Sequence, residues 1–199
     1  MTDAGRVYGG RSERERRADR RARLLAAGLD LFGTEGWTAT TIEKICTSAG
    51  VATRSFYEEF SSREALLLAV FEDVLSGVVS EVRPRVVVGG GVEQQLRAGL
   101  SGYVEHLTAD PRRARVVHHE IRVAGSLEDR RQAAVVRFAD LISQVAQLPD
   151  TPQTRTIGIA LAGAVSEVLV DWVAQPEPRP ETGPLVEVLV DLFLAALPH

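Results

Sequence analysis

The sequence predicts an all-α protein, and three observations support this prediction. Apolar residues recur three and four positions apart along most of the 199 residues, which is the period of an amphipathic helix. No segment alternates apolar and polar residues as a half-buried strand does, and no internal repeat is present. Ser, Thr or Asp precedes several of the apolar runs, and Gly or Pro comes after them, as at the ends of helices.

Composition indicates a globular protein. Hydrophobic residues make up 45% of the chain and charged residues 25%, which is ordinary for such a protein. No apolar run approaches the roughly 20 residues that a membrane span needs, and the sequence after Met1 is not a signal peptide. We therefore expect a cytoplasmic protein with no membrane contact. The single cysteine, Cys46, excludes an internal disulfide and is expected to be a small buried side chain.

Charge is unevenly distributed along the chain. The net charge is −4, yet residues 1–23 carry eight arginines against four acidic residues. Residues 71–199 carry 12 basic and 17 acidic residues, a balance of −5. Positive charge therefore gathers at the N-terminal end, as a surface that faces phosphates requires. We expect residues 1–15 to be a disordered basic arm, which either reaches a minor groove or stays solvated.

The first helix is expected over residues 16–32. Leu24, Leu31 and Phe32 mark its buried face, and Gly33 ends it. Trp37 comes next and is expected to close the core of a small three-helix head, which we assign to residues 16–61.

Two short helices joined by a tight turn are predicted within residues 40–60. Thr40 and Glu43 fit a capping box that opens the first of them. Gly50 ends this helix, because glycine adopts a positive φ at little cost. The second helix runs from Thr53 to Phe60. This arrangement matches a DNA-binding helix-turn-helix, although any small helical bundle can contain such a turn.

The outward residues of this region suit phosphate oxygens and base edges, because they are hydroxyls, guanidinium groups and a phenol. The side chains that we expect to contact DNA are Thr40, Thr41, Thr53, Arg54, Ser55, Tyr57 and Arg63.

The chain from Arg21 to about Leu75 resembles the tetracycline-repressor (TetR) family of bacterial transcriptional regulators. The residues that carry the resemblance are Leu31-Phe32-Gly33, Gly36-Trp37, Thr40, Ile42, Ile45, Ala49-Gly50-Val51, Ser55-Phe56-Tyr57, Phe60 and Arg63-Glu64-Ala65-Leu66. The resemblance implies a homodimeric DNA-binding protein with an effector cavity among its middle helices.

Two positions depart from the pattern of this family. Arg54 stands where the family often has glycine, and Ala52 stands where it often has serine. We therefore expect Thr53 to cap the recognition helix and Arg54 to add base contacts of its own.

A long helix is expected from Ser62 to Arg83, opened by a capping box in which Ser61 and Glu64 take part. At 1.5 Å per residue it is roughly 30 Å long, so it connects the head to the C-terminal part of the chain. Arg63 in its first turn is placed to meet a phosphate. Pro84 ends the helix, and residues 88–91 form a flexible joint.

Residues 62–199 are expected to form a larger helical domain for effector binding and dimerisation. Its further helices are predicted at 92–108, 110–124, 126–148, 151–174 and 185–197. The last helix is apolar almost all round, so it needs a second partner surface. The residues expected at a homodimer interface are Val168, Leu189 and Phe193. The alternative is a last helix that is fully buried within one chain.

No catalytic or metal-binding pattern is present, and we expect no enzyme activity, no cofactor and no metal. His118 and His119 are neighbours on a helix and point about 100° apart, so they cannot face one metal ion together. Some aromatic and polar side chains are typical of a ligand pocket instead. The residues expected to line it are Tyr103, His106, His118, Phe138, Ser166 and Trp172.

The function expected from these features is that of a repressor that binds a palindromic operator in double-stranded DNA and is released by a small-molecule effector. The effector would act on the tilt of the long helix relative to the head. Two alternatives remain open. One is a small-molecule-binding protein whose head does not bind DNA specifically, which Glu58 and Glu59 beside the DNA-facing surface favour. The other is an enzyme. The sequence names neither the effector nor the operator.

Overall fold

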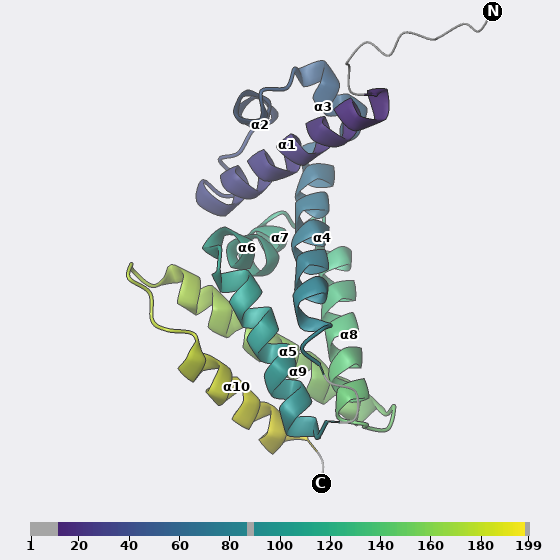
Figure 1. Ribbon diagram of the computed structural model, residues 1–199, viewed down its shortest axis with the longest axis vertical. Coiled ribbons are helices and arrows are strands. Elements are labelled where there is room, and N and C mark those ends of the chain that lie inside the picture. Colours follow the sequence, from purple (N-terminus) through teal and green to yellow (C-terminus); the bar gives the residue numbers. More distant parts are fainter. Residues whose placement is uncertain (1–11, 87–89, 198–199) are drawn as a thin grey trace, which may run out of the picture.

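The computed structural model describes residues 12–86 and 90–197 (Figure 1). Within these ranges every regular element is a helix, so the all-α prediction is confirmed. A small head lies at one end of the molecule, a larger helical domain lies at the other, and one long helix runs between them. Residues 1–11 of the predicted arm, and residues 88 and 89 of the predicted joint, lie outside the described residues.

The head consists of α1 (Glu13–Thr34), α2 (Ile42–Ala49) and α3 (Thr53–Glu59). A capping box opens α1, because Ser12 Oγ accepts from Glu15 N while the Glu15 carboxylate accepts from Ser12 N. The expected start at residue 16 is therefore wrong, and residues 13–15 are helical rather than part of an arm.

Gly33 lies inside α1 and does not end it. The missing side chain leaves room for the larger domain, since a Cβ on Gly33 would lie 2.4 Å from the Cβ of Arg112. Trp37 is 8% exposed and packs against Phe32 with ring centroids 5.8 Å apart, so it closes the core of the head as expected.

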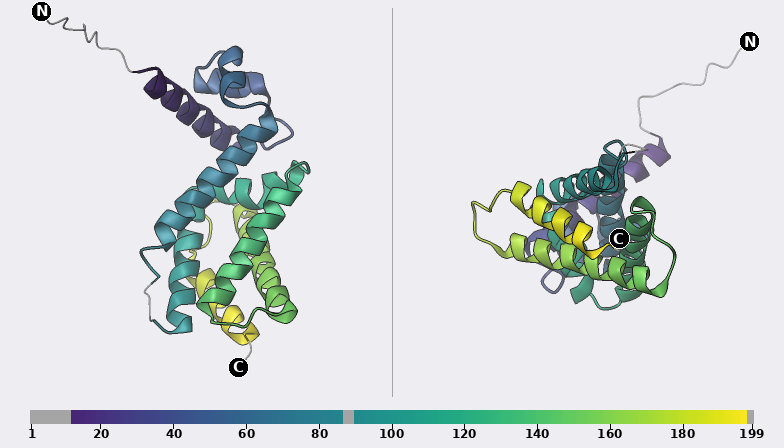
Figure 2. Two further views of the ribbon diagram at one scale, coloured as in Figure 1. Left: turned by 90° about the vertical axis from the view of Figure 1, so that its right-hand side faces the viewer. Right: turned by 90° about the horizontal axis from the view of Figure 1, so that it is seen from below.

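The connecting helix, α4 (Arg63–Val82), passes from the head into the larger domain, where it packs against α5 (Val92–Thr108) (Figure 2). Its apolar stripe is buried along the whole length, from Leu66 to Val78. Ser62 caps it by accepting from Ala65 N at 3.1 Å, so the expected capping box with Ser61 is wrong by one residue.

The larger domain continues with a helical segment that is interrupted by one π-helical turn. Asp110 caps this segment by accepting from Arg112 N, as expected. The elements after α5 are α6 (Pro111–Arg115), the π-helical turn η1 (Val116–Glu120), α7 (Ile121–Val123), α8 (Glu128–Val145), α9 (Pro152–Ala174) and α10 (Gly183–Ala196). The π-helical turn was not expected from the sequence, and it lies between the head and the core of the larger domain.

Helices α8 and α9 pack closely because Gly158 has no side chain. A Cβ there would lie 2.8 Å from the Cβ of Ala139. The buried face of α8 is therefore formed by Ala139 and Ile142. Leu141 lies on another face of α8 and is 48% exposed.

One described helix, α9, is long and apolar enough to cross a membrane by length and composition. This differs from the expectation that no segment approaches such a length. In the fold α9 packs against α8 and against η1, and 33% of its most apolar 18-residue window is buried. Core helices of globular proteins pass the same test.

The apolar residues of α10 divide into two faces. Leu189 and Phe193 are each 1% exposed, so they belong to the core of the single chain and cannot be interface residues as expected. Val188 is 66% exposed and Leu192 is 43% exposed on the other face. The predicted apolar character of the helix is right, but the face assigned to a partner is wrong. Val168 of α9 is partly buried against the same core.

Candidate DNA-binding surface and effector cavity

The turn between α2 and α3 has the geometry of a helix-turn-helix. Gly50 ends α2 with a φ of 60°, a left-handed conformation that glycine adopts without strain. Thr41 caps α2 by accepting from Lys44 N. Thr40 does not cap it, because its side chain is fully buried and donates to the carbonyl of Gly36 at 2.8 Å. The expected roles of Thr40 as a cap and as a DNA-contacting side chain are therefore wrong.

Helix α3 presents an exposed polar face. Ala52 precedes it without any side-chain cap, so Thr53 is the first helical residue rather than the expected cap. Thr53 is exposed, and the Arg54 side chain is 93% exposed, with only a loose ion pair to Glu58 at 3.7 Å. Tyr57 is 55% exposed on the same helix. These side chains, together with partly buried Ser55, form the surface that a DNA groove would meet.

Arg63 is partly buried and its guanidinium has partners within the protein, which differs from the expectation that it is free to face a phosphate. Its guanidinium lies 3.8 Å over the Trp37 ring, and Nη1 donates to the carbonyl of Thr40. The side chain therefore ties the start of α4 to the segment that leads into α2.

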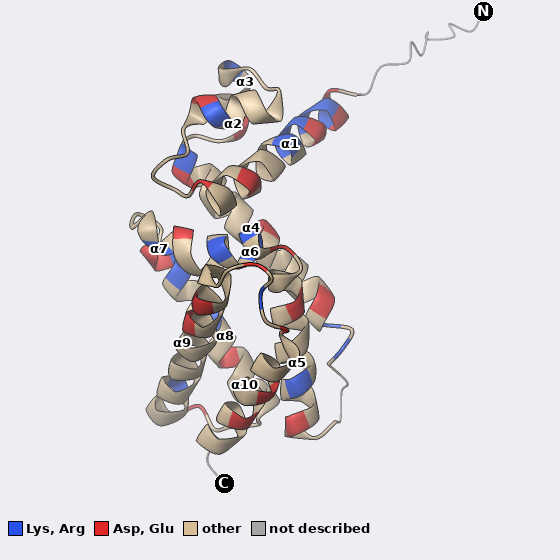
Figure 3. Ribbon diagram, turned by 90° about the vertical axis from the view of Figure 1, so that its left-hand side faces the viewer, with Lys and Arg blue, Asp and Glu red and all other residues tan. Residues whose placement is uncertain are grey.

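Basic residues gather along the N-terminal half of α1, beside α3 (Figure 3). Two of them neutralise Glu59, whose side chain is 1% exposed: Arg20 Nη2 lies 2.7 Å from it and Arg17 Nε 3.2 Å. Burial alone would raise the pKa of the Glu59 carboxyl, but the hydrogen bonds from Arg20 and Arg17 outweigh it and hold the pKa below its ordinary value. Glu59 thus joins α3 to α1 and presents no free negative charge to DNA.

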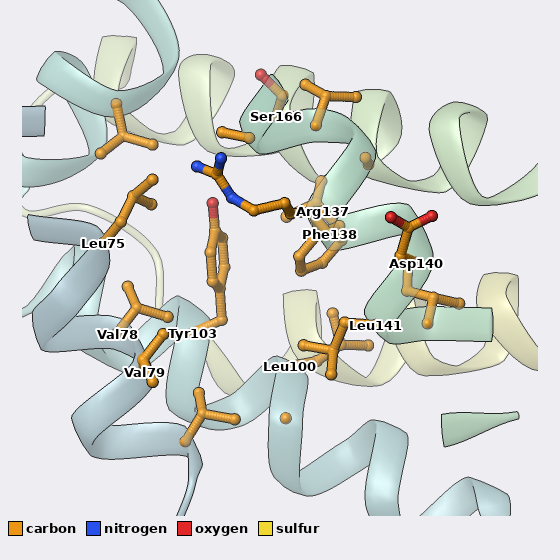
Figure 4. Close-up of a pocket in the computed structure, with 18 of the residues that line it drawn as sticks. Leu75, Val78, Val79, Leu100, Tyr103, Arg137, Phe138, Asp140, Leu141 and Ser166 are labelled. Atoms are coloured by element: carbon orange, nitrogen blue, oxygen red, sulfur yellow. The ribbon is translucent and has the colours of Figure 1, made fainter. Parts of the chain in front are cut away.

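A cavity of about 990 Å³ lies in the larger domain between α4, α5, α8 and α9 (Figure 4). Most of its lining is apolar, as in sites for small molecules, and its size is at the upper end of the usual range. Four of the six predicted pocket residues line it, namely Tyr103, His118, Phe138 and Ser166.

The other two predicted pocket residues lie elsewhere. The His106 ring packs into the space beside Gly77, within 2.6 Å of where a Cβ would stand. Trp172 donates its indole N–H to the carbonyl of Pro180 at 3.0 Å, and Arg179 lies over its ring. Both expectations are therefore wrong, since amphipathic side chains also fill ordinary packing sites.

Sequence reasoning missed the apolar wall and the charged side chains of the cavity. Leu75, Val78 and Val79 line it from α4, and none of them was among the expected pocket residues. Arg137 of α8 also lines the cavity, and nothing in its local sequence distinguishes it from other arginines.

A chain of three neutral polar groups crosses the cavity wall. The Tyr103 hydroxyl lies 3.3 Å from His118 Nε2, and His118 Nδ1 lies 3.1 Å from Ser166 Oγ. Burial lowers the pKa of His118 to about 3, and the nearby charge of Arg122 adds to the effect. Burial also raises the pKa of Tyr103 well above its ordinary value. Neither group is charged at neutral pH.

One buried carboxylate joins the larger domain to the head. Glu120, at the end of η1, is 2% exposed, and its Oε2 accepts from the backbone N–H of Trp37 at 2.7 Å. Its Oε1 accepts from Arg115 Nε at 2.8 Å, and Arg115 Nη1 donates to the carbonyl of Thr34. Gly36 turns the chain here with a φ of 89°. This Glu120–Arg115 pair holds the turn between α1 and α2 against η1.

A second ion pair supports the same contact between the two parts. Arg112 Nη1 lies 2.8 Å from Asp30 Oδ1 of α1, while its other nitrogens bond to Asp110. The hydrogen bonds to Asp110 and Asp30 keep the pKa of the Arg112 guanidinium above its ordinary value. Because η1 carries His118 toward the cavity and Glu120 toward the head, a single turn touches both sites.

The sequence of the head matches a known family. Residues 24–70 match the family described as bacterial regulatory proteins, tetR family. Over 173 residues, 84% of the chain, the sequence is 27% identical to the HTH-type transcriptional activator FasR of Mycolicibacterium smegmatis, and the match covers 78% of that protein.

The whole fold matches solved structures of regulators. The fatty acid degradation regulator FadR from Bacillus halodurans superposes with a TM-score of 0.77 at 21% identity, over 90% of this chain and 97% of that one. FadR from Bacillus subtilis in complex with stearoyl-CoA superposes with a TM-score of 0.73 at 16% identity, over 89% of this chain and 99% of that one. At these identities the likeness shows the fold alone.

Arg63→Ala is expected to destabilise the protein, because it removes the stacking on Trp37 and the hydrogen bond to Thr40 O. The loss should be about 1–3 kcal/mol in the free energy of unfolding, measured with urea. Tyr57→Ala, a change at an exposed side chain of the head, is the control and should stay within about 0.5 kcal/mol. Equal stability of Arg63→Ala and wild type would contradict the structural role given to Arg63.

Proposed function

Since the chain belongs to the TetR family of bacterial transcriptional regulators, we propose that it is a homodimeric repressor of a palindromic operator, released by an apolar small molecule. It is a DNA-binding helix-turn-helix regulator and not an enzyme. The observation that carries the effector part of this proposal is the large apolar cavity beside α4. A protein that binds the bacterial chromosome acts in the cytoplasm, which is the location we propose.

Direct reading of bases is assigned to Arg54. Its side chain is almost fully exposed on α3, and its ion pair with Glu58 is long and solvated, so it contributes little to stability. A guanidinium can donate two hydrogen bonds to guanine O6 and N7 in a major groove. Tyr57, Thr53, Ser55 and Thr41 are assigned to phosphates and sugars, which position the helix without reading sequence.

Arg54→Ala should weaken binding to the DNA upstream of the gene for this protein by about 1–3 kcal/mol and binding to random DNA much less. Fluorescence anisotropy at several salt concentrations measures both affinities. Arg130→Ala, which removes an exposed arginine from the larger domain, serves as the control. If Arg54→Ala lowers affinity for both DNAs by the same factor, Arg54 does not read a base.

Dimerisation is assigned to the outer faces of α9 and α10. Val188 and Leu192 leave an apolar surface on α10. On α9, Gly163 has no atom within 4 Å of a possible Cβ, so its side of the helix is open to close approach by another chain. A second copy that covers both helices would bury apolar surface which is otherwise costly to expose, and four helices would meet at the interface.

Leu192→Glu should convert a dimer into a monomer, because it places a charge in the centre of this apolar surface. Sedimentation velocity at micromolar concentration measures the mass. Val123→Glu, at an equally exposed apolar residue on α7, should remain a dimer. A monomeric wild type, or a dimeric Leu192→Glu protein, would contradict the assignment.

Acyl chains are the effector class that we propose for the cavity. The lining from α4 and α8 is apolar, and the volume suits an elongated ligand. The FadR neighbour in complex with stearoyl-CoA supports the same class. The alternative, a binding protein whose head ignores DNA, rested on Glu58 and Glu59; it is weakened because Glu59 is buried between two arginines.

The effector is proposed to act through both α4 and η1. In a dimer, the recognition helices must lie roughly 34–36 Å apart to enter successive major grooves. A small change in the tilt of α4, or in the position of η1 against the head, would alter this spacing. Binding in the cavity would then lower operator affinity, and operator binding would lower effector affinity by the same factor.

A further inference from the structure

Two arginines that line the cavity, Arg83 at the end of α4 and Arg137 of α8, have no carboxylate partner in the part of the chain that the structure describes. Arg137 lines the cavity, and the part of the chain that the structure describes contains no ion pair or hydrogen bond of its guanidinium. Arg122 and Arg131 also line the cavity, but Glu167 and Glu128 pair with them at 2.5 Å. Among the arginines that line the cavity from α7 and α8, Arg137 is therefore the one that remains available to a ligand.

The guanidinium of Arg137 is directed at a polar group and not at solvent alone. In Figure 4, Arg137 and Tyr103 point toward one another across the cavity, from α8 and α5. Asp140, one turn further along α8, is directed away from Arg137. The other acidic residue of the lining, Glu72, is exposed on α4. Neither carboxylate pairs with Arg137 in the described structure.

The polar chain behind Tyr103 leaves one hydroxyl hydrogen without an acceptor. Tyr103, neutral His118 and Ser166 together carry three polar hydrogens, and the two links between them use two. If Ser166 donates to His118 Nδ1 and Nε2–H donates to the Tyr103 oxygen, the Tyr103 hydrogen points to the cavity. A negative oxygen beside Arg137 favours this arrangement, because it supplies the missing acceptor.

We propose that Arg137 and Tyr103 form an oxyanion subsite, which binds the negatively charged head of an apolar chain whose tail fills the rest of the cavity. The shared chemistry is an anionic oxygen in the head of a molecule whose tail is an acyl chain. Two sources supply it, namely the carboxylate of a free fatty acid, which lies directly on the acyl chain, and a phosphate of an acyl-CoA, which the pantetheine arm separates from the acyl chain. A desolvated charge needs such paired, charge-assisted hydrogen bonds, which the apolar remainder of the lining cannot provide.

This subsite rests on the proposed effector cavity and adds a selection for charge. An apolar cavity alone would bind 1-dodecanol at least as tightly as dodecanoate, because the two have the same tail and burying an unpaired carboxylate costs free energy. With the subsite, dodecanoate binds more tightly by roughly 10- to 100-fold, the range expected for a charged hydrogen-bonded contact.

The test is calorimetric titration of the full-length protein with dodecanoate, 1-dodecanol and dodecanoyl-CoA. Arg137→Gln should lower the affinity for the anionic probe by roughly 10- to 100-fold and leave 1-dodecanol unchanged. Tyr103→Phe keeps the ring that packs on Phe138, and its affinity for the same probe should fall several-fold. Arg130→Gln, an exposed arginine of α8 outside the cavity lining, is the matched control and should bind all three probes as wild type does.

The outcomes distinguish a bound carboxylate from a bound phosphate. They also distinguish failure of the subsite from failure of the proposed effector cavity. Loss of dodecanoate binding in Arg137→Gln supports the subsite with a carboxylate, and loss of dodecanoyl-CoA binding supports it with a phosphate. Equal affinity of wild type and Arg137→Gln for both anionic probes, with 1-dodecanol bound, overturns the subsite and keeps the apolar cavity. If wild type binds operator DNA but none of the probes, the acyl effector itself is wrong, and the subsite fails with it.

Discussion

The buried carboxylate of Glu120 sets how the two parts of this protein meet. A carboxylate removed from water must be hydrogen-bonded, and Glu120 meets this requirement with one donor from each side, the backbone N–H of Trp37 and the guanidinium of Arg115. The turn after α1 therefore cannot move away from η1 without leaving a buried charge unpaired. The orientation of the head depends on this contact, and within the head the ion pairs of Glu59 with Arg17 and Arg20 join α3 to α1.

In the proposed function, the η1 turn is the point where a ligand in the cavity would influence DNA binding. A π-helical turn holds more residues than an α-helical one and is frequently found at functional sites. Here the same turn directs His118 to the cavity wall and Glu120 to the head. A ligand changes DNA affinity only if it binds the two arrangements of the protein with different affinity. Contact with the Tyr103–His118–Ser166 chain gives a ligand a direct means of favouring one arrangement of η1.

Local patterns in the sequence predicted most of the fold, and the errors have tertiary causes. Helix periods, Gly50 and the Asp110 cap depend on neighbours in sequence, so the helices were placed almost correctly. Thr40 and Arg63 are polar and were expected to face DNA, but Trp37 and Gly36 offer them partners that only the fold brings near. Leu189 and Phe193 were assigned to a partner because an apolar helix does not reveal which face its own chain covers. The sequence predicted a ligand pocket. It could not place Arg137 in the lining, because that depends on how α8 packs.

Coupling between cavity and head is the central claim, and Glu120→Gln tests it most directly. The amide keeps the shape of the side chain but accepts from only one of its two donors, so the contact with the head weakens. The measurement is the operator affinity with and without saturating dodecanoyl-CoA, in wild type and in Glu120→Gln. The account predicts a factor of roughly 5 to 150 in wild type and a factor close to one in the variant, with dodecanoyl-CoA still bound. An unchanged factor in Glu120→Gln would contradict the coupling through η1.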